Sequence, residues 1–213
     1  MLRFALNDPL SLVLWVLALL PAIVLHELAH AVVAYRMGDP TPRYEGRLTL
    51  DPRAHIDPIG ALMLFLFGFG WARPVNVNPY HFPNGRRGMM LVALAGPLAN
   101  VTLAWLSGLL WEATLWLPGQ GMLGGIGPAL REFFILSLRV NLWLAAFNLI
   151  PIPPLDGSRI LAGLVSSRQA VALARLEAYG PLLLVLLIMS GVSQLLLQPI
   201  YRILQMLVLA GRL

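Results

Sequence analysis

A long apolar run near the start of the chain, residues 10–37, sets the strongest limit on the fold. The run is long enough to cross the hydrocarbon core of a bilayer as a helix, and it lacks the alternation typical of a strand. Pro21 is expected to kink this helix, and Gly38-Asp39-Pro40 to end it. Composition supports the same class, because 58% of the residues are hydrophobic and only 12% are charged, against about 25% charged in soluble domains. The sequence therefore predicts an integral membrane protein.

Later apolar runs predict an all-α polytopic membrane protein, with about four to five membrane helices in one domain covering residues 1–213. Two further spans are expected at residues 88–111 and 129–150. Another apolar stretch covers residues 181–197, and residues 200–213 predict either a surface helix or a further partial span. Residues 158–178 are amphipathic and are expected to lie along the membrane interface. Residues 1–20 are not expected to be a cleaved signal peptide, because no small-x-small site precedes Pro21.

Two segments between the first and second spans have weak strand patterns, at residues 44–50 and 71–78. The apolar segment between them, residues 59–69, is too short to span a bilayer. Non-helical backbone at membrane depth is tolerated only where protein or a water-filled cavity satisfies its polar groups. We therefore expect a small re-entrant β element here, which covers or lines a site.

The distribution of arginine predicts the orientation. All basic side chains other than histidine are arginines, and seven of them lie between the first and second spans: Arg36, Arg43, Arg47, Arg53, Arg73, Arg86 and Arg87. The segment between the second and third spans, residues 111–128, has none. Loops rich in arginine face the cytoplasm, so the N-terminus is expected outside, although Arg3 argues against this. With so few charges overall, the net charge of +5 predicts anchoring at a lipid bilayer, with no nucleic acid partner.

His26-Glu27-Leu28-Ala29-His30 lies inside the first apolar run. Residues four apart share one face of a helix, so His26 and His30 can hold one Zn²⁺ between them. Glu27 lies beside the same position, where its carboxylate can take a proton from water at the metal. The alternative is a pair of buried, hydrogen-bonded histidines with a stray acid. Ionisable groups inside a membrane helix are costly, which favours the metal site.

A catalytic zinc ion needs a third protein ligand, and the chain contains no cysteine, so histidine or a carboxylate must supply it. The candidates are Asp156, His55, Asp57 and Asp51. Asp156 is the best of these, because it follows a helix broken by prolines at the depth expected for the two histidines. Its alternative role is that of an ordinary turn aspartate before glycine. His55 is either a neighbour of the metal or a loop residue at the interface.

Three motifs in order carry a resemblance to a known family. They are His26-Glu27-Leu28-Ala29-His30, then Gly96-Pro97-Leu98-Ala99-Asn100, then Phe147-Asn148-Leu149-Ile150-Pro151-Ile152-Pro153-Pro154-Leu155-Asp156-Gly157. The chain resembles the site-2 protease family of intramembrane zinc metalloproteases, in particular the short prokaryotic members without PDZ or CBS domains. The resemblance covers most of the chain.

The resemblance implies one zinc ion per chain, with His26, His30 and Asp156 as ligands and Glu27 as the general base. It implies Asn100 and Asn148 as residues that contact substrate or shape the site. It also implies cleavage of a peptide bond within or near the transmembrane segment of a membrane-protein substrate. The expected location is a prokaryotic plasma membrane, with the active site towards the cytoplasm. A substrate helix must unwind first, and the expected strands would capture it by edge pairing.

Two other function classes fit parts of the pattern. A zinc-binding membrane transporter also has ligands near the midplane and broken helices. However, it needs no base beside the first histidine, and the chain shows no internal repeat. A non-catalytic membrane scaffold would not need both ligands and Glu27. The presence of Glu27 therefore favours the protease.

Overall fold

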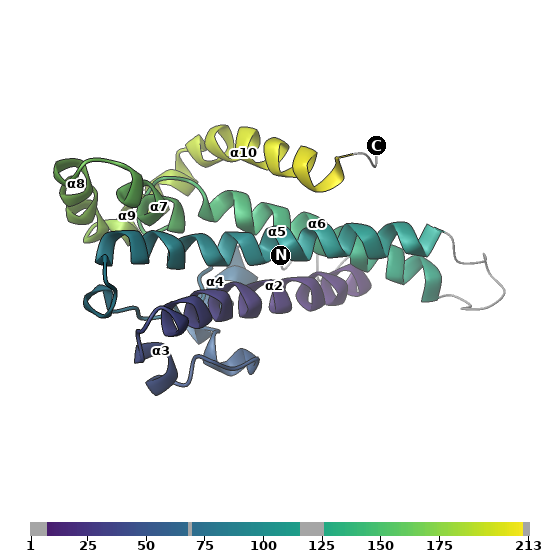
Figure 1. Cartoon of the computed structure of the whole chain (residues 1–213). Coiled ribbons are helices and arrows are strands. Elements are labelled where there is room, and N and C mark those ends of the chain that lie inside the picture. The colour runs from purple at the N-terminus through teal and green to yellow at the C-terminus, as the bar shows by residue number, and fades with distance from the viewer. Residues whose placement is uncertain (1–7, 68–69, 116–125, 211–213) are drawn as a thin grey trace.

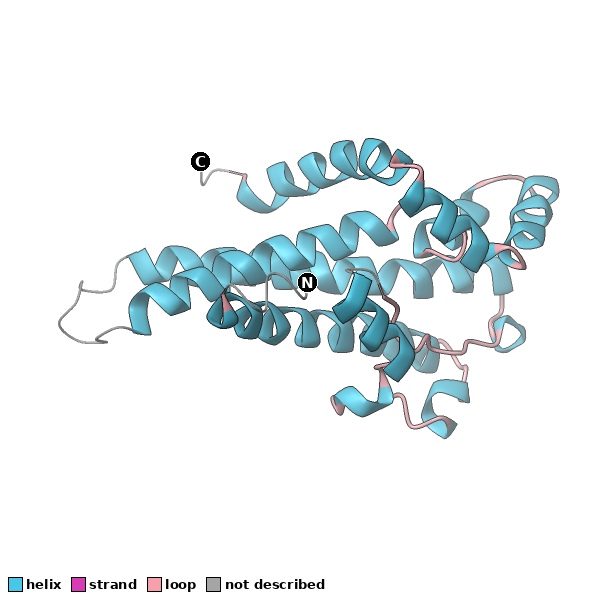
Figure 2. Ribbon diagram, turned by 180° about the vertical axis from the view of Figure 1, so that it is seen from behind, coloured by secondary structure: helices cyan, strands magenta, loops and turns pink. Residues whose placement is uncertain are grey.

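The computed structural model describes residues 8–67, 70–115 and 126–210, and these residues form helices and loops without a β-strand (Figure 2). Three long helices, α2 (Pro9–Arg36), α5 (Gly85–Leu115) and α6 (Ile126–Asn148), pack side by side as the centre of the molecule (Figure 1). The shorter elements are α3 (Thr41–Tyr44), η1 (Pro52–Ala54), α4 (Pro58–Phe67), η2 (Pro79–His81), α7 (Asp156–Leu164), α8 (Ser167–Glu177), α9 (Gly180–Met189) and α10 (Val192–Leu209).

The main apolar core lies where α6 packs against α5 and α10. Leu142, Ala145 and Ala146 of α6 are fully buried there, together with Ile150 just after α6 and Ala104 of α5. The alanines let the helix backbones approach closely, as small residues do in membrane bundles. This core fixes the C-terminal end of α6, from which the chain leads to Asp156.

Three of these helices are long and apolar enough to cross a membrane: α2, α5 and α10. A fourth candidate span results if α8 and α9 are taken together as one span with an 80° bend between them. The expectation of four to five spans is therefore met only at its lower end. The helix expected at residues 129–150 exists as α6, but it is not among the helices that qualify by length and composition. It carries Arg131, Glu132 and Arg139.

The amphipathic segment expected at residues 158–178 is two helices, α7 and α8. Ser166 divides them, because its hydroxyl caps the start of α8 and the Gln169 side chain reaches back to the Ser166 amide. The apolar stretch expected at residues 181–197 is also divided. Gly191, at a φ of 72°, separates α9 from α10.

The expected re-entrant β element is wrong. The described residues contain only an isolated antiparallel bridge between Ile56 and Ala72. The expected strand at residues 44–50 has no regular structure beyond Tyr44, the last residue of α3. The short apolar segment is the helix α4, which is too short to span.

The expected strand at residues 71–78 fails because side chains occupy its backbone. The Arg47 guanidinium donates to the carbonyls of Arg73 (3.1 Å) and Pro74 (2.7 Å). The amide of Val75 donates to Glu27, and the amide of Asn78 donates to Asp39. These groups would otherwise form the ladder to a neighbouring strand. The charge-free loop between α5 and α6 falls largely at residues 116–125, outside the described residues, as does Arg3.

Candidate functional site

His26 and His30 lie one turn apart on the face of α2 that packs against α5, and both are buried. Their Nε2 atoms are 3.1 Å apart. The close approach depends on Gly96 of α5, because a Cβ atom there would lie 2.6 Å from His26 Cε1 and would overlap the His30 ring as well. The Gly96 backbone therefore forms one wall of the site.

Asp156 reaches the same point from the other end of the sequence. The chain leaves α6, passes through the proline-rich turn and starts α7 at Asp156. Its Oδ2 atom lies 3.2 Å from His26 Nε2 and 3.3 Å from His30 Nε2. Gly157 permits this turn, because a Cβ atom there would lie 2.5 Å from the Leu149 carbonyl carbon. The structure thus brings together the three residues that the sequence proposed as ligands.

The hydrogen bonds of the two imidazoles fix which nitrogen faces the centre. His26 Nδ1 lies 2.6 Å from Asn100 Oδ1, and His30 Nδ1 lies 2.7 Å from the Val92 carbonyl oxygen. Both partners are oxygens that only accept, so each Nδ1 must donate its proton. A neutral imidazole then has its lone pair on Nε2.

This donor set fits a metal ion. Three electron-rich atoms converge in a buried position, and within the described residues Asp156 Oδ2 has no hydrogen-bond donor. Their separations are 3.1, 3.2 and 3.3 Å. Ligands about 2.0–2.1 Å from a tetrahedral zinc ion lie about 3.3 Å from one another. Histidine nitrogen and carboxylate oxygen are also ligand types that zinc accepts in catalytic sites.

Glu27 lies next to His26 on α2 and is almost as buried as the histidines. Its Oε2 atom accepts a hydrogen bond from the Val75 amide at 3.3 Å. Arg47 supports this contact, because its buried guanidinium holds the carbonyls of Arg73 and Pro74 immediately before Val75. A carboxylate held in this way can act on a molecule at the neighbouring metal position.

The other candidate ligands have different partners. His55 is fully buried, but its Nε2 atom pairs with the Thr49 carbonyl at 2.8 Å, and it is not part of the three-residue cluster. Asp51 forms an ion pair with Arg53, and Asp57 caps the Gly60 amide at the start of α4. These two acids support local turns.

The two asparagines of the motifs differ in position. Asn100 is fully buried and contacts His26 directly. The Asn148 amide instead donates to the Leu144 carbonyl of its own helix at 3.0 Å. The sequence did not predict two further contacts around the site. One is the bonding of Arg47 to the carbonyls before Val75, and the other is the contact of Asn141 with Asn100. A polar residue inside an apolar helix is the only signal that pointed to Asn141.

Comparison with known proteins identifies the family. The profile described as Peptidase family M50 matches residues 126–190. The chain is 40% identical over 192 residues to a Bacillus subtilis protein named "Putative zinc metalloprotease YwhC", which covers 90% of this chain and 87% of the relative. It is 35% identical over 179 residues to "Putative zinc metalloprotease Rip2" of Mycobacterium tuberculosis, covering 80% of this chain and 64% of that relative.

A Methanocaldococcus jannaschii protein named "Putative zinc metalloprotease MJ0611" is 34% identical over 146 residues, which cover 65% of this chain and 63% of the relative. No solved structure matches the chain significantly. The close match along nearly the whole Bacillus subtilis relative, the matching profile and the buried His-His-Asp cluster agree with one another. The chain belongs to peptidase family M50, the site-2 protease family of zinc metalloproteases.

Proposed function

We propose that this protein is an intramembrane zinc metalloprotease that hydrolyses a peptide bond within or near the transmembrane segment of a membrane-protein substrate. His26, His30 and Asp156 are the metal ligands, one ion is bound per chain, and Glu27 is the general base. The observation that carries the proposal is the convergence of three buried ligand atoms at about zinc-ligand spacing, with Glu27 beside them.

Each group has a distinct task in this mechanism. Zinc at this position supplies Lewis acidity, which polarises a carbonyl and lowers the pKa of water towards about 7. Glu27 takes the proton of the attacking water and delivers it to the leaving amine. The Val75 amide holds the carboxylate of Glu27 in place between these two transfers. A substrate helix must unwind first, because its carbonyls are otherwise occupied by its own hydrogen bonds.

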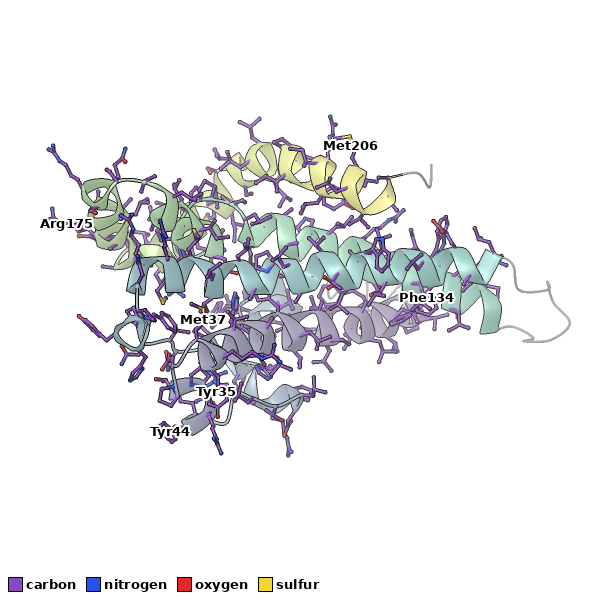
Figure 3. All side chains as sticks on the ribbon, viewed as in Figure 1. Tyr35, Met37, Tyr44, Phe134, Arg175 and Met206 are labelled. Carbon is purple, nitrogen blue, oxygen red and sulfur yellow. The ribbon has the colours of Figure 1, made fainter. Side chains whose placement is uncertain are left out.

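We also propose that the metal centre lies towards the cytoplasmic side of a prokaryotic plasma membrane. The C-terminal end of α2, α3, the start of α5, α7 and α8 gather at one end of the bundle (Figure 1). Figure 3 shows Tyr35, Met37 and Arg175 at this end, with Phe134 of α6 towards the other end. Seven arginines lie between the last residue of α2 and the first turn of α5, which are both at this end, and segments rich in arginine face the cytoplasm.

The test compares wild-type protein with Glu27→Gln, both purified and loaded with zinc, on a model membrane substrate. We expect Glu27→Gln to retain zinc and to lose cleavage, because glutamine cannot accept the proton. Asp51→Asn is the control, since Asp51 pairs with Arg53 away from the cluster. Equal cleavage by Glu27→Gln and wild type would remove the proposed base and, with it, the proteolytic mechanism.

A further inference from the structure

A chain of buried amide groups runs from His26 into the middle of the bundle. Asn100 of α5 contacts His26 Nδ1 through its Oδ1 atom, and its Nδ2 atom donates to the Ala22 carbonyl at 3.0 Å and to Asn141 Oδ1 at 2.9 Å. Asn141 of α6 donates in turn to the Ser137 carbonyl at 2.9 Å. Asn100 and Asn141 are 0% and 2% exposed, so water does not compete for these bonds.

The chain has a direction that its far end determines. The Ser137 carbonyl can only accept, so it fixes the Asn141 amide with its nitrogen towards Ser137 and its oxygen towards Asn100. Asn141 Oδ1 and the Ala22 carbonyl then both require the Asn100 nitrogen, which leaves the Asn100 oxygen facing His26. A reversed Asn100 would place its oxygen against two other acceptors.

The direction matters because an asparagine oxygen and an asparagine nitrogen demand opposite forms of histidine. Facing the Asn100 oxygen, His26 carries its proton on Nδ1 and offers a lone pair at Nε2. Facing the nitrogen, it would carry the proton on Nε2, which is the atom 3.2 Å from Asp156. That proton would block the ligand position.

We propose that Asn141 is a positioning residue of the metal centre, which acts through Asn100 to hold His26 in the form that binds metal at Nε2. The proposal rests on the proposed function, because it takes His26 to be a ligand. The same bonds tie together α2, α5 and α6, so the helix that leads to Asp156 is aligned with the helix that carries His26.

The first test measures zinc affinity by chelator competition, independently of cleavage. Outer partners of metal-binding histidines contribute about 10- to 100-fold in metal affinity. We expect Asn141→Leu to weaken zinc binding by about tenfold. In this variant only the Ala22 carbonyl still holds the Asn100 side chain with its oxygen towards His26. Ser107→Ala is the matched control, since Ser107 joins the same two helices through the Ser137 hydroxyl at 2.9 Å, whereas Asn141 donates to the Ser137 carbonyl at 2.9 Å and lies 3.5 Å from that hydroxyl. Zinc affinity should be unchanged in Ser107→Ala.

The second test asks whether Asn141 acts through Asn100. If it does, the double variant Asn100→Ala, Asn141→Leu binds zinc as weakly as Asn100→Ala alone, and additive losses would overturn the proposal. ¹⁵N spectra of histidine-labelled, metal-free protein report the ring form directly. We expect His26 to be protonated at Nδ1 in wild type and to be a mixture of both forms in Asn141→Leu.

Two further variants guard against a folding defect. Asn141→Asp in its protonated form offers one acceptor and one donor in the same places, so it should restore zinc affinity. Asn141→Ser is the second disruptive variant, for use if Asn141→Leu does not fold. Its side chain is too short to reach Asn100, so it should weaken zinc binding by about the factor expected for Asn141→Leu, about tenfold. Unchanged zinc affinity and an unchanged His26 ring form in either disruptive variant would overturn the role of Asn141. Such a result would leave the Glu27→Gln test of proteolysis unaffected.

Discussion

Gly96→Ala is the substitution most directly predicted to damage the metal centre. Ordinary contact of a Cβ atom begins at 3.4 Å, and the new Cβ would lie 2.6 Å from His26 Cε1. Relief requires a shift of at least 0.8 Å (3.4 Å minus 2.6 Å) between α5 and the histidine pair, because the overlap with His30 Nε2 is larger still. Zinc sites tolerate deviations of only about 0.2 Å in ligand distance. The added methyl group therefore displaces a ligand by more than the site can absorb.

The magnitude follows from the cost of overpacking. Inserting a methyl group into a packed interior costs about 1–3 kcal/mol. If the bound state carries this cost, zinc affinity falls by about tenfold to a hundredfold, at roughly 1.4 kcal/mol for each factor of ten. The metal-free protein is affected less, because its histidines can turn away from the new methyl group.

Chelator competition on purified protein measures the zinc affinity, and thermal unfolding of the metal-free form measures the structural cost separately. Gly88→Ala is the control, because it adds the same methyl group to the same helix. Its Cβ would lie 2.5 Å from Phe82 Cγ, away from the histidines. We expect Gly88→Ala to lower stability with zinc affinity unchanged. Equal zinc affinity in Gly96→Ala and wild type, or equal losses in both variants, would refute the steric argument.

Three further predictions concern residues around the site. Arg47→Lys should loosen residues 73–75 and slow cleavage, because a lysine cannot reproduce the fork that bonds both carbonyls; hydrogen exchange of Val75 and the cleavage rate measure this. For Asp39, burial opposes ionisation, but hydrogen bonds from Thr41 and the Asn78 amide outweigh it and lower the pKa below 3.8. Its stabilising effect is therefore present above pH 3.8 and is lost as the pH falls through the lowered pKa, so unfolding free energies measured against pH should fall less steeply on acidification in Asp39→Asn than in wild type. Asn148→Ala should leave zinc affinity unchanged, since its amide bonds within its own helix, and a large loss in chelator competition would contradict this.

The convergence of His26, His30 and Asp156 was predictable from the sequence because the chemistry of these residues is local or strongly constrained. The spacing of His26 and His30 is a property of any helix, and a carboxylate in a broken membrane helix has few roles other than ligation. The first two long helices were also predicted closely, since α2 ends at Arg36 and α5 continues beyond Trp111 by one turn.

The β element could not be excluded from the sequence because its failure depends on distant side chains. The excess of arginine in cytoplasmic loops treats Arg47 as a surface cation. In the structure Arg47 is buried and donates hydrogen bonds to the backbone that a strand would need. Glu27 and Asp39 take two amides of the same segment. No local pattern reveals such competition. Asn141 was missed for the same reason, since its importance depends on a partner from another helix.

The assembly of the metal centre from both halves of the chain has a consequence for biosynthesis. The ribosome releases α2, with its two histidines, well before Asp156 and the amides of α5 and α6 that surround the cluster. A nascent chain that ends before α5 therefore has His26 and His30 without Asp156 and without the groups that contact them. Under the proposed function, firm zinc binding therefore waits until Asp156 and the surrounding helices are in place, and a shorter nascent chain would be inactive.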